Sequence, residues 1–259
     1  MQDYGLVSII MPTWACASLI GDTIKSVQGQ SYTNWELLIQ DDCSTDNTSK
    51  VVQTYSDGDA RIKYECNPHN SGAAVTRNNA LKRARGRWIA FLDSDDLWES
   101  TKLERQLKFM VDNNYHFSYT SYKEIDDKSK ETGIVVSGPK HVTKFGMYSF
   151  CWPGCLTVMY DSEVVGLIQI PDIKKNNDYA MWLKACHKAD CYLLDEVLAK
   201  YRRGRVGSIS THGYTTMIRW HYKLWHEAMN MNMVTSLFWT GMNLVCGAFK
   251  KMKYVHHTK

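Results

Sequence analysis

The sequence lacks any Cys-x-x-Cys pair, although it contains eight cysteines. The closest pair, Cys151 and Cys155, has no second pair at ligand spacing, so a structural zinc site is not expected. A disulfide scaffold is typical of short secreted chains, whereas this chain has 259 residues. We therefore predict free thiols that pack as small apolar side chains in a reducing cytosol.

A hydrophobic run long enough to span a bilayer is also lacking. The first apolar run, residues 6–11, is far too short, and no basic stretch precedes it, so it predicts neither a signal peptide nor a membrane span. The chain is therefore expected to fold in the cytosol. The net charge of +4 is mild, and no basic helix or aromatic strand platform stands out, so nucleic-acid binding has little support.

The first hundred residues alternate between strand and helix patterns. Apolar runs predict strands at residues 6–11, 35–40 and 88–92, and residues 61–66 also read as a strand. Helical spacing and N-cap residues predict helices at residues 19–27, 44–55, 72–84 and 102–113. This alternation predicts an α/β fold with a mostly parallel central sheet flanked by helices. Such sheets place ligands at the carboxyl ends of their strands.

The second half of the sequence is less regular, and it contains no internal repeat or low-complexity linker. Strands are predicted at residues 117–122, 134–136 and 155–160, with one or two more within 192–201. Residues 123–130 read as a polar turn and residues 178–189 as a helix. From residue 214 onward the pattern is helical throughout. The simplest division is one domain to residue 212 and a helical tail over residues 213–259.

Carboxylates follow two of the predicted strands. Asp93-Ser94-Asp95-Asp96 follows the strand at 88–92, and Asp41-Asp42 follows the strand at 35–40. Mg²⁺ and Mn²⁺ prefer oxygen ligands and often combine one or two protein carboxylates with substrate phosphates. Two carboxylates one residue apart can therefore hold a metal that bridges a diphosphate. The alternative is a solvated turn whose carboxylates cap the next helix.

Three other positions have a chemical and an ordinary interpretation. Arg77 follows Gly72 on a predicted helix, where it can reach a phosphate or Asp95, or it is simply a surface arginine. Asp178 lies near the start of a predicted helix. It is either an ordinary helix cap or a general base that removes a proton from an acceptor hydroxyl. Pro12-Thr13, at the end of the first strand, is by itself an ordinary turn.

Taken in order, these segments resemble the family 2 glycosyltransferases, which have the GT-A fold. The match covers most of the first 210 residues. Its segments are Val7–Thr13 (the opening strand), Ser26–Ile39 (helix to strand), Asp41–Asp46 (Asp-Asp-Gly-Ser-x-Asp), Gly72–Asn78 (Gly-x-x-x-x-Arg-Asn), Asp93–Asp96 (Asp-x-Asp-Asp), Asn177-Asp178 with Trp182 (Glu-Asp and Trp-Leu), and Tyr201-Arg202 with Ser208–Ser210 (Tyr-Arg and Ser-x-Ser). Each motif alone is unspecific, but their order and spacing together are specific to the family.

The resemblance implies an inverting hexosyltransferase that uses Mn²⁺ or Mg²⁺ and a nucleotide-sugar donor, with UDP favoured. The acceptor would be a saccharide, often lipid-linked, in surface polysaccharide biosynthesis such as that of capsule or O-antigen. Residues 1–100 would bind the donor and 101–212 the acceptor. By this resemblance, Pro12, Thr13 and Asp42 would line the nucleotide pocket, Arg77 would lie on the diphosphate side, and Asp93 and Ser94 would contact the donor. Asp95 would bind the metal and Asp178 would be the base. Trp182, Arg202 and Arg203 are candidates for the acceptor side or its loop.

Three positions depart from the family pattern. Cys43 replaces the usual glycine, so the turn there is not expected to need a positive φ angle. Asn177 replaces the usual glutamate, which leaves Asp178 as the only carboxylate of that pair. Gly204 stands near the position where many members carry histidine, and Arg202, Arg203 or Arg205 are candidates to supply the positive charge instead.

The C-terminal tail combines aromatic, apolar and basic residues. Residues 234–249 are mostly apolar, and Lys250, Lys251 and Lys253 follow. The apolar run is short against the ~20 residues of a membrane span. Its composition suits a helix lying in the interface of an anionic leaflet, so we expect a protein that is peripheral on the inner face of the plasma membrane. The alternative is a helix that packs on the catalytic domain or on a partner subunit.

Two rival functions share parts of this pattern. Phosphatases of the haloacid dehalogenase type also place Asp-x-Asp after an apolar strand, with the first Asp as the nucleophile. They expect Thr or Val four residues later, where this chain has Leu97, and they carry the motif early in the chain. A nucleotide-sugar binding protein without catalysis would lack Asp178 or the metal carboxylates, and all of these are present.

Overall fold

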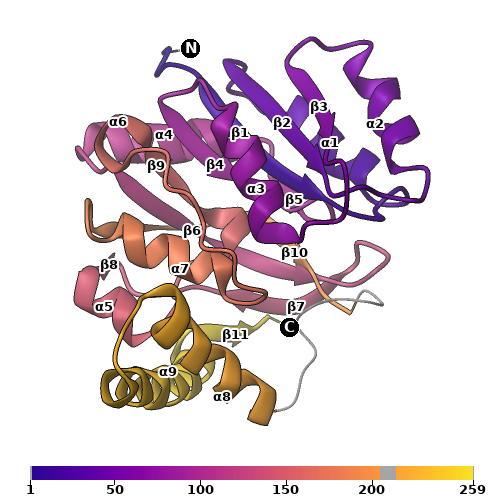
Figure 1. Ribbon diagram of the computed structural model, residues 1–259. Helices are drawn as coiled ribbons and strands as arrows, with labels where there is room; N and C mark the ends of the chain where they lie inside the picture. Colours follow the sequence, from indigo (N-terminus) through magenta and orange to yellow (C-terminus); the bar gives the residue numbers. More distant parts are fainter. Residues whose placement is uncertain (1, 205–213, 259) are drawn as a thin grey trace.

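The structure is a computed structural model that describes residues 2–204 and 214–258 (Figure 1). In its amino-terminal half, the strands lie in the order β4-β1-β2-β3 and are parallel. Their bounds are β1 (Val7–Thr13), β2 (Trp35–Asp41), β3 (Ile62–Cys66) and β4 (Trp88–Phe91). Ile10 of β1 stands opposite Leu38 of β2 and Phe91 of β4. The predicted parallel α/β sheet is thus confirmed.

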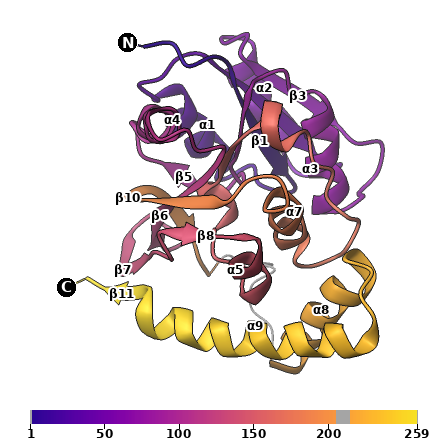
Figure 2. The same ribbon diagram turned by 90° about the vertical axis from the view of Figure 1, so that its left-hand side faces the viewer.

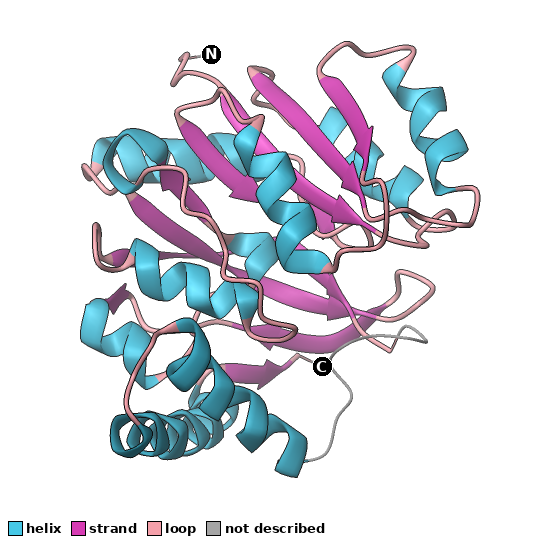
Figure 3. Ribbon diagram, viewed as in Figure 1, coloured by secondary structure: helices cyan, strands magenta, loops and turns pink. Residues whose placement is uncertain are grey.

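Helices cover both faces of this sheet because successive β1 side chains point to opposite sides (Figure 3). Ile10 packs in one core with α3 (Ala73–Lys82) and α7 (Asn177–Ala185). Ile9 packs in the other core, to which three further helices contribute. These are α1 (Ile20–Gln28), α2 (Thr48–Ser56) and α4 (Lys102–Asp112). The sheet is therefore buried on both faces, as the continuous apolar strand sequences predict.

In the second half of the chain, β6 (Phe117–Ile125) is the central strand. It pairs antiparallel with β7 (Glu131–Val136) and β9 (Met159–Asp161), and parallel with β10 (Cys191–Arg202). β9 joins this half to the first, because it also pairs with β4. The smaller elements are β5 (Leu97–Trp98), β8 (His141–Val142), α5 (Lys144–Ser149) and α6 (Ser162–Val165).

Two predictions in this half were wrong. β6 runs on to Ile125, so the polar turn is confined to the hairpin tip, where the carboxylate of Asp126 accepts from two backbone N–H groups. Residues 155–157 form a 3-10 turn instead of a strand, because Thr157 bonds back to Gly154 through both its N–H and its hydroxyl. Of the one or two strands expected within residues 192–201, the structure has one, the longer strand β10, which contains register shifts.

The tail consists of α8 (Tyr214–Lys223), a π-helical turn η2 (Leu224–Ala228), α9 (Met233–Lys253) and β11 (Val255–His257). The prediction of helix throughout was wrong at its end, since β11 pairs with β7 and extends the sheet. Figure 2 shows α9 running along the outside of the molecule. None of the helices in the described ranges is both long enough and apolar enough to cross a bilayer.

Candidate active site

The carboxyl ends of β1, β2 and β4 meet at one edge of the sheet. Asp42, just after β2, donates its backbone N–H to the carbonyl of Thr13 at 2.9 Å. On the other side of β1, Leu92 N–H bonds the carbonyl of Ile10 at 3.1 Å. The sequence segments Pro12-Thr13, Asp41-Asp42 and Asp93–Asp96 therefore start from adjacent strand ends, as predicted for a parallel sheet.

Asp42 holds the loop that leads into α3. Its Oδ1 accepts from Asn67 at 3.0 Å and from the Ser71 N–H at 2.7 Å, and its Oδ2 accepts from the Gly72 N–H at 2.8 Å. Gly72 has φ 85°, a conformation that glycine adopts without strain. A carboxylate has about four acceptor positions, so these three bonds leave Asp42 capacity for one ligand donor.

Asn67 is a site residue that sequence reasoning missed. It is buried, and besides the bond to Asp42 its amide donates to the Thr76 hydroxyl at 3.0 Å. Its side-chain oxygen, Oδ1, accepts from the side-chain amides of Gln40 and Asn79. Asn67 thereby ties the end of β2 to α3. A single asparagine in a loop carries no spacing pattern, so no sequence signal distinguishes it from an ordinary turn residue.

Cys43 adopts a positive φ angle, which was not expected for a cysteine at this turn. Its φ angle is 60°, so the expectation that cysteine relieves this turn of a positive φ was wrong. The turn is imposed by Asp41, whose carboxylate accepts from the Ser44 N–H at 3.0 Å and from the Tyr64 hydroxyl at 2.7 Å. A side chain in the left-handed region costs roughly 1–2 kcal/mol.

We expect Cys43→Gly to raise the free energy of unfolding by about 0.5–1 kcal/mol. Glycine relieves the left-handed strain but gains flexibility in the unfolded chain, which offsets part of the benefit. Urea unfolding measures the change, and Cys43→Ala is the matched control because it keeps the Cβ atom. Equal stability of the two variants would show that the turn is not strained.

The loop after β4 is fixed from both sides. The carbonyl of Ser94 accepts from the Thr23 hydroxyl of α1 at 2.9 Å and from the Cys16 thiol at 3.3 Å. On the other side, Arg202 donates its backbone N–H to Asp96 at 2.7 Å and its Nε to the carbonyl of Asp95 at 2.8 Å. Contacts to the backbone of Ser94 and Asp95 and to the carboxylate of Asp96 therefore hold this loop, while the side chains of Asp93 and Asp95 are half-buried at the sheet edge.

Asp93, Asp95 and Asp96 lie together on this loop, but they do not form a complete metal site by themselves. Asp96 is buried, and its Oδ2 has no hydrogen-bond partner among the described residues. Burial, and next the charges of Asp95 and Asp93, raise the pKa of Asp96 well above its usual value. Within residues 2–204 and 214–258, no group of three His, Cys, Asp or Glu side chains is arranged to hold a metal. A cation here would thus use one or two carboxylates and complete its shell with donor phosphates.

Arg77 links this loop to α7. It is buried on α3, and its Nη1 donates to Asn177 Oδ1 at 2.9 Å while Nη2 forms an ion pair with Asp93. The sequence suggests a phosphate or Asp95 as its partner, and the carboxylate it contacts is that of Asp93. Burial would lower the pKa of Arg77, but the charges of Asp93 and Asp178 raise it above its ordinary value. Asn177, in place of the family's glutamate, accepts from this arginine without adding a charge.

Asp178 lies in the first turn of α7, where the helix dipole favours a negative charge. Its side chain is half-buried, and Oδ1 accepts from the Tyr179 N–H at 2.8 Å. Tyr179 is buried and donates its hydroxyl to the carbonyl of Met147 at 2.8 Å. The tyrosine thus anchors the start of α7, and the carboxylate of Asp178 remains within electrostatic reach of Arg77.

Three other predicted residues have structural partners. Trp182 is fully buried and packs edge-on against Phe91 at a centroid distance of 5.1 Å, so the expected acceptor contact is corrected to a core position. The guanidinium of Arg202 is buried and also donates to the carbonyl of Asp126. Arg203 pairs with Glu124 at 2.9 Å. Arg205 and the segment 208–210 lie outside the described residues.

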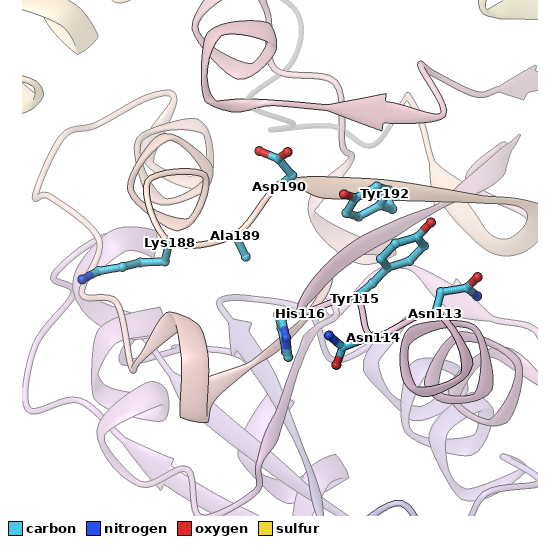
Figure 4. Close-up of a pocket in the computed structure, with 8 residues that line it drawn as sticks. All are labelled: Asn113, Asn114, Tyr115, His116, Lys188, Ala189, Asp190 and Tyr192. Carbon is cyan, nitrogen blue, oxygen red and sulfur yellow. The ribbon is translucent and has the colours of Figure 1, made fainter.

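A hollow of about 350 Å³ opens elsewhere on the molecule (Figure 4). It is lined by residues 113–116 of the α4–β6 connection, residues 188–190 of the α7–β10 connection, and Tyr192 of β10. Tyr192 stacks there on Tyr115 and His141, and His141 bonds Asp190 at 2.7 Å. The sheet-edge carboxylates lie instead at the opposite ends of α4 and α7, so this hollow is separate from the candidate active site.

The cysteines agree with the sequence prediction of free thiols. All eight are free, and four of them are buried: Cys16, Cys155, Cys186 and Cys191. Burial raises the pKa of Cys155 and the charge of Arg77 lowers it, and burial is the larger effect, so this pKa lies well above its usual value. A thiol held in its neutral form is a weak nucleophile and a weak metal ligand, so the site's chemistry is left to the carboxylates.

The family profile and two similar relatives all point to glycosyltransferases. The sequence profile described as Glycosyl transferase family 2 matches residues 8–153. The chain is 43% identical over 198 residues to the putative teichuronic acid biosynthesis glycosyltransferase TuaG of Bacillus subtilis, covering 76% of this chain and 79% of that protein. It is 40% identical over 221 residues to the Escherichia coli UDP-Glc:alpha-D-GlcNAc-diphosphoundecaprenol beta-1,3-glucosyltransferase WfgD, covering 85% of each.

Solved structures share the fold. The crystal structure of S. aureus TarS 1-349 in complex with UDP-GlcNAc superposes with a TM-score of 0.70 at 21% identity, over 95% of this chain and 74% of that one. The mannosyltransferase PcManGT of Pyrobaculum calidifontis, in complex with GDP-Man and Mn²⁺, gives a TM-score of 0.63 at 17% identity, over 95% and 75%. With the sequence matches, this GT-A architecture establishes that the chain is a glycosyltransferase and belongs to family 2.

Proposed function

We propose that this enzyme transfers a hexose from a UDP-sugar to a lipid-linked saccharide during synthesis of a surface polysaccharide, with inversion at the sugar carbon. The observation that carries the proposal is the contact chain from Asp93 through Arg77 to Asn177, which brings the strand-end carboxylates and Asp178 into one site. The relative WfgD, whose name specifies UDP-Glc and a GlcNAc-diphosphoundecaprenol acceptor, supports this choice of donor and acceptor.

The donor is proposed to bind across the ends of β1, β2 and β4. Pro12, Thr13 and Asp42 would face the nucleoside. The hydroxyl of Thr13 is buried without a hydrogen-bond partner among the described residues, so a bound nucleoside could satisfy it. Asp93 and Ser94 would lie along the ribose and diphosphate.

Asp95 is proposed to hold Mn²⁺ or Mg²⁺ together with the diphosphate oxygens. The cation would supply positive charge where negative charge builds on the departing diphosphate. Arg77 would add to this positive charge from the other side, and it also keeps Asp93 in place. Arg202 would act as a positioning residue through its contacts with Asp95 and Asp96.

Asp178 is proposed to act as the general base. It would remove the proton from the acceptor hydroxyl, whose oxygen then bonds the anomeric carbon of the sugar. The bond from that carbon to the diphosphate oxygen breaks, and UDP departs with the electron pair. Attack from the face opposite the diphosphate inverts the anomeric configuration. Proton removal of this kind contributes about 10²–10⁴-fold to the rate.

A lipid-linked acceptor implies that the enzyme works at a membrane surface, and we propose that it is peripheral on the inner face of the plasma membrane through its C-terminal tail. Support comes from the apolar and basic composition of that tail.

The proposal is tested by incubating the purified enzyme with Mn²⁺, a panel of UDP- and GDP-hexoses, and a synthetic GlcNAc-diphosphate-polyprenol. We expect UDP release and a disaccharide product with one UDP-hexose, and proton NMR should show the inverted anomeric linkage. Transfer from GDP-sugars alone, or a product of retained configuration, would contradict the proposed donor or the proposed role of Asp178.

A further inference from the structure

α9 turns mostly polar side chains toward the domain, whereas an ordinary surface helix turns apolar side chains inward. Its buried residues are Ser236, Trp239, Thr240 and Asn243, of which three are polar. A helix that packs on a domain normally turns its apolar stripe inward. Here the polar residues are satisfied inside, for example by the bonds from Asn243 to the carbonyls of Tyr148 at 2.9 Å and Ser149 at 2.8 Å. The side of the helix facing the domain is therefore specified by hydrogen bonds as much as by apolar packing.

The opposite side of α9 is apolar and exposed. At 100° per residue, one stripe within an arc of about 120° contains Gly241, Ala248 and six large side chains. The six are Val234, Leu237, Phe238, Val245, Phe249 and Met252, which are between 43% and 79% exposed. We call these six residues the α9 outer face. Phe145 of α5 is also exposed, and it contacts Trp239, on the buried side of α9, at a ring-centroid distance of 5.4 Å.

Only positive charges accompany this face. The helix contains no Asp or Glu, and its last turn carries Lys250, Lys251 and Lys253. Lys250 points inward to the carbonyl of Trp152 at 2.8 Å. Lys251 and Lys253 are exposed and, by helical geometry, fall on the two sides of the apolar stripe. An apolar stripe bordered by lysines matches the boundary between lipid headgroups and acyl chains.

We propose that the α9 outer face binds the surface of an anionic lipid bilayer, with α9 lying parallel to the membrane plane. The occupant is inferred to be lipid because a second copy of the helix would offer no carboxylate to Lys251 and Lys253. Anionic headgroups supply that charge. Figure 2 shows α9 running along the lower boundary of the molecule.

The same helix is connected to the catalytic base. Asn243 donates to the hydroxyl of Tyr179 at 3.1 Å, and Tyr179 directly follows Asp178 in α7. Trp225 of η2 also contacts the Tyr179 ring and donates to Asn243 at 3.2 Å. Lipid contact by α9 would thus fix the orientation of α7 relative to the membrane. This consequence rests on the proposed function, whereas the lipid contact itself rests on α9 alone.

The test is vesicle flotation of the full chain, with no donor or acceptor present. Vesicles of phosphatidylglycerol and phosphatidylethanolamine are compared with vesicles of phosphatidylcholine. We expect the wild type to float with the anionic vesicles and at least tenfold less with the neutral ones. Phe238→Glu should reduce flotation on anionic vesicles at least tenfold, and Lys251→Glu with Lys253→Glu should abolish the preference for anionic lipid.

The matched control is Val111→Glu, which places the same charge on an exposed apolar position of α4. It should float like the wild type, and circular dichroism melting verifies that each variant is folded. Flotation of folded Phe238→Glu at the wild-type level would overturn the proposal. So would a wild type that does not float but forms a dimer which Phe238→Glu dissociates, since the face would then bind a second copy.

The two proposals can fail separately. Transfer to a short-chain acceptor in detergent does not need a bilayer, so Phe238→Glu should retain wild-type activity there. A chain that floats but transfers no sugar would leave the lipid contact intact and contradict the proposed function. A chain that transfers sugar in detergent but does not float would support the proposed function and contradict the lipid contact.

Discussion

Asp178→Asn is expected to reduce sugar transfer about 10²–10⁴-fold while leaving donor affinity close to that of the wild type. Asparagine has nearly the same shape and can still accept the bond from the Tyr179 N–H, so α7 should keep its start. It cannot take a proton from an acceptor hydroxyl, and loss of a general base costs about 10²–10⁴ in rate. Steady-state rates of UDP release and calorimetric titration with UDP measure the two quantities.

Asp172→Asn is the control for this variant. Asp172 is an exposed carboxylate only a few residues before α7, so the same charge is removed without touching the site. It should transfer sugar at the wild-type rate. Wild-type activity of Asp178→Asn would assign the base to another residue, whereas loss of UDP binding would show that Asp178 supports the donor site.

Asp95→Ala is expected to weaken Mn²⁺-dependent binding of UDP at least about a hundredfold, or about 2.7 kcal/mol. The loop itself should survive, because its bonds to Arg202 and Thr23 involve the backbone of Asp95 and Ser94 and the carboxylate of Asp96. The substitution removes a carboxylate that would compensate the cation, and it leaves Asp93 engaged with Arg77. Binding of UDP without metal should change little.

The control for Asp95→Ala is Asp127→Ala, an exposed carboxylate at the β6–β7 hairpin tip. Calorimetric titration of both variants with UDP, each with and without Mn²⁺, gives the comparison. If Asp95→Ala bound UDP with an unchanged dependence on metal, the cation would have to be held by other residues, and the assignment of Asp95 would be wrong.

The sheet and the strand-end carboxylates are predictable because they follow from local pattern. Apolar runs mark β1, β2 and β4, and parallel strands end at a common edge, so the amino-acid sequence alone predicts Asp42 and Asp95 there. The ion pair of Arg77 with Asp93 cannot be chosen in the same way. An arginine side chain is long enough to reach several carboxylates, and which one it meets depends on how α3 packs on the sheet.

Other features depend on contacts distant in sequence or on local bonds that composition does not reveal. Cys43 adopts a positive φ because the carboxylate of Asp41 bonds the Ser44 N–H. The strand at 255–257 forms only because the edge of β7 is available to it. Trp182 matched a family motif, but a motif does not say whether a side chain faces a substrate or the core.

The central claim, a metal-dependent UDP-sugar site at the ends of β1, β2 and β4, is tested most directly by calorimetric titration of the purified wild type with UDP, GDP and CDP, each with and without Mn²⁺. We predict saturable binding of UDP that strengthens at least tenfold with Mn²⁺, and much weaker binding of GDP and CDP. No UDP binding by the folded protein with Mn²⁺ present would contradict the claim.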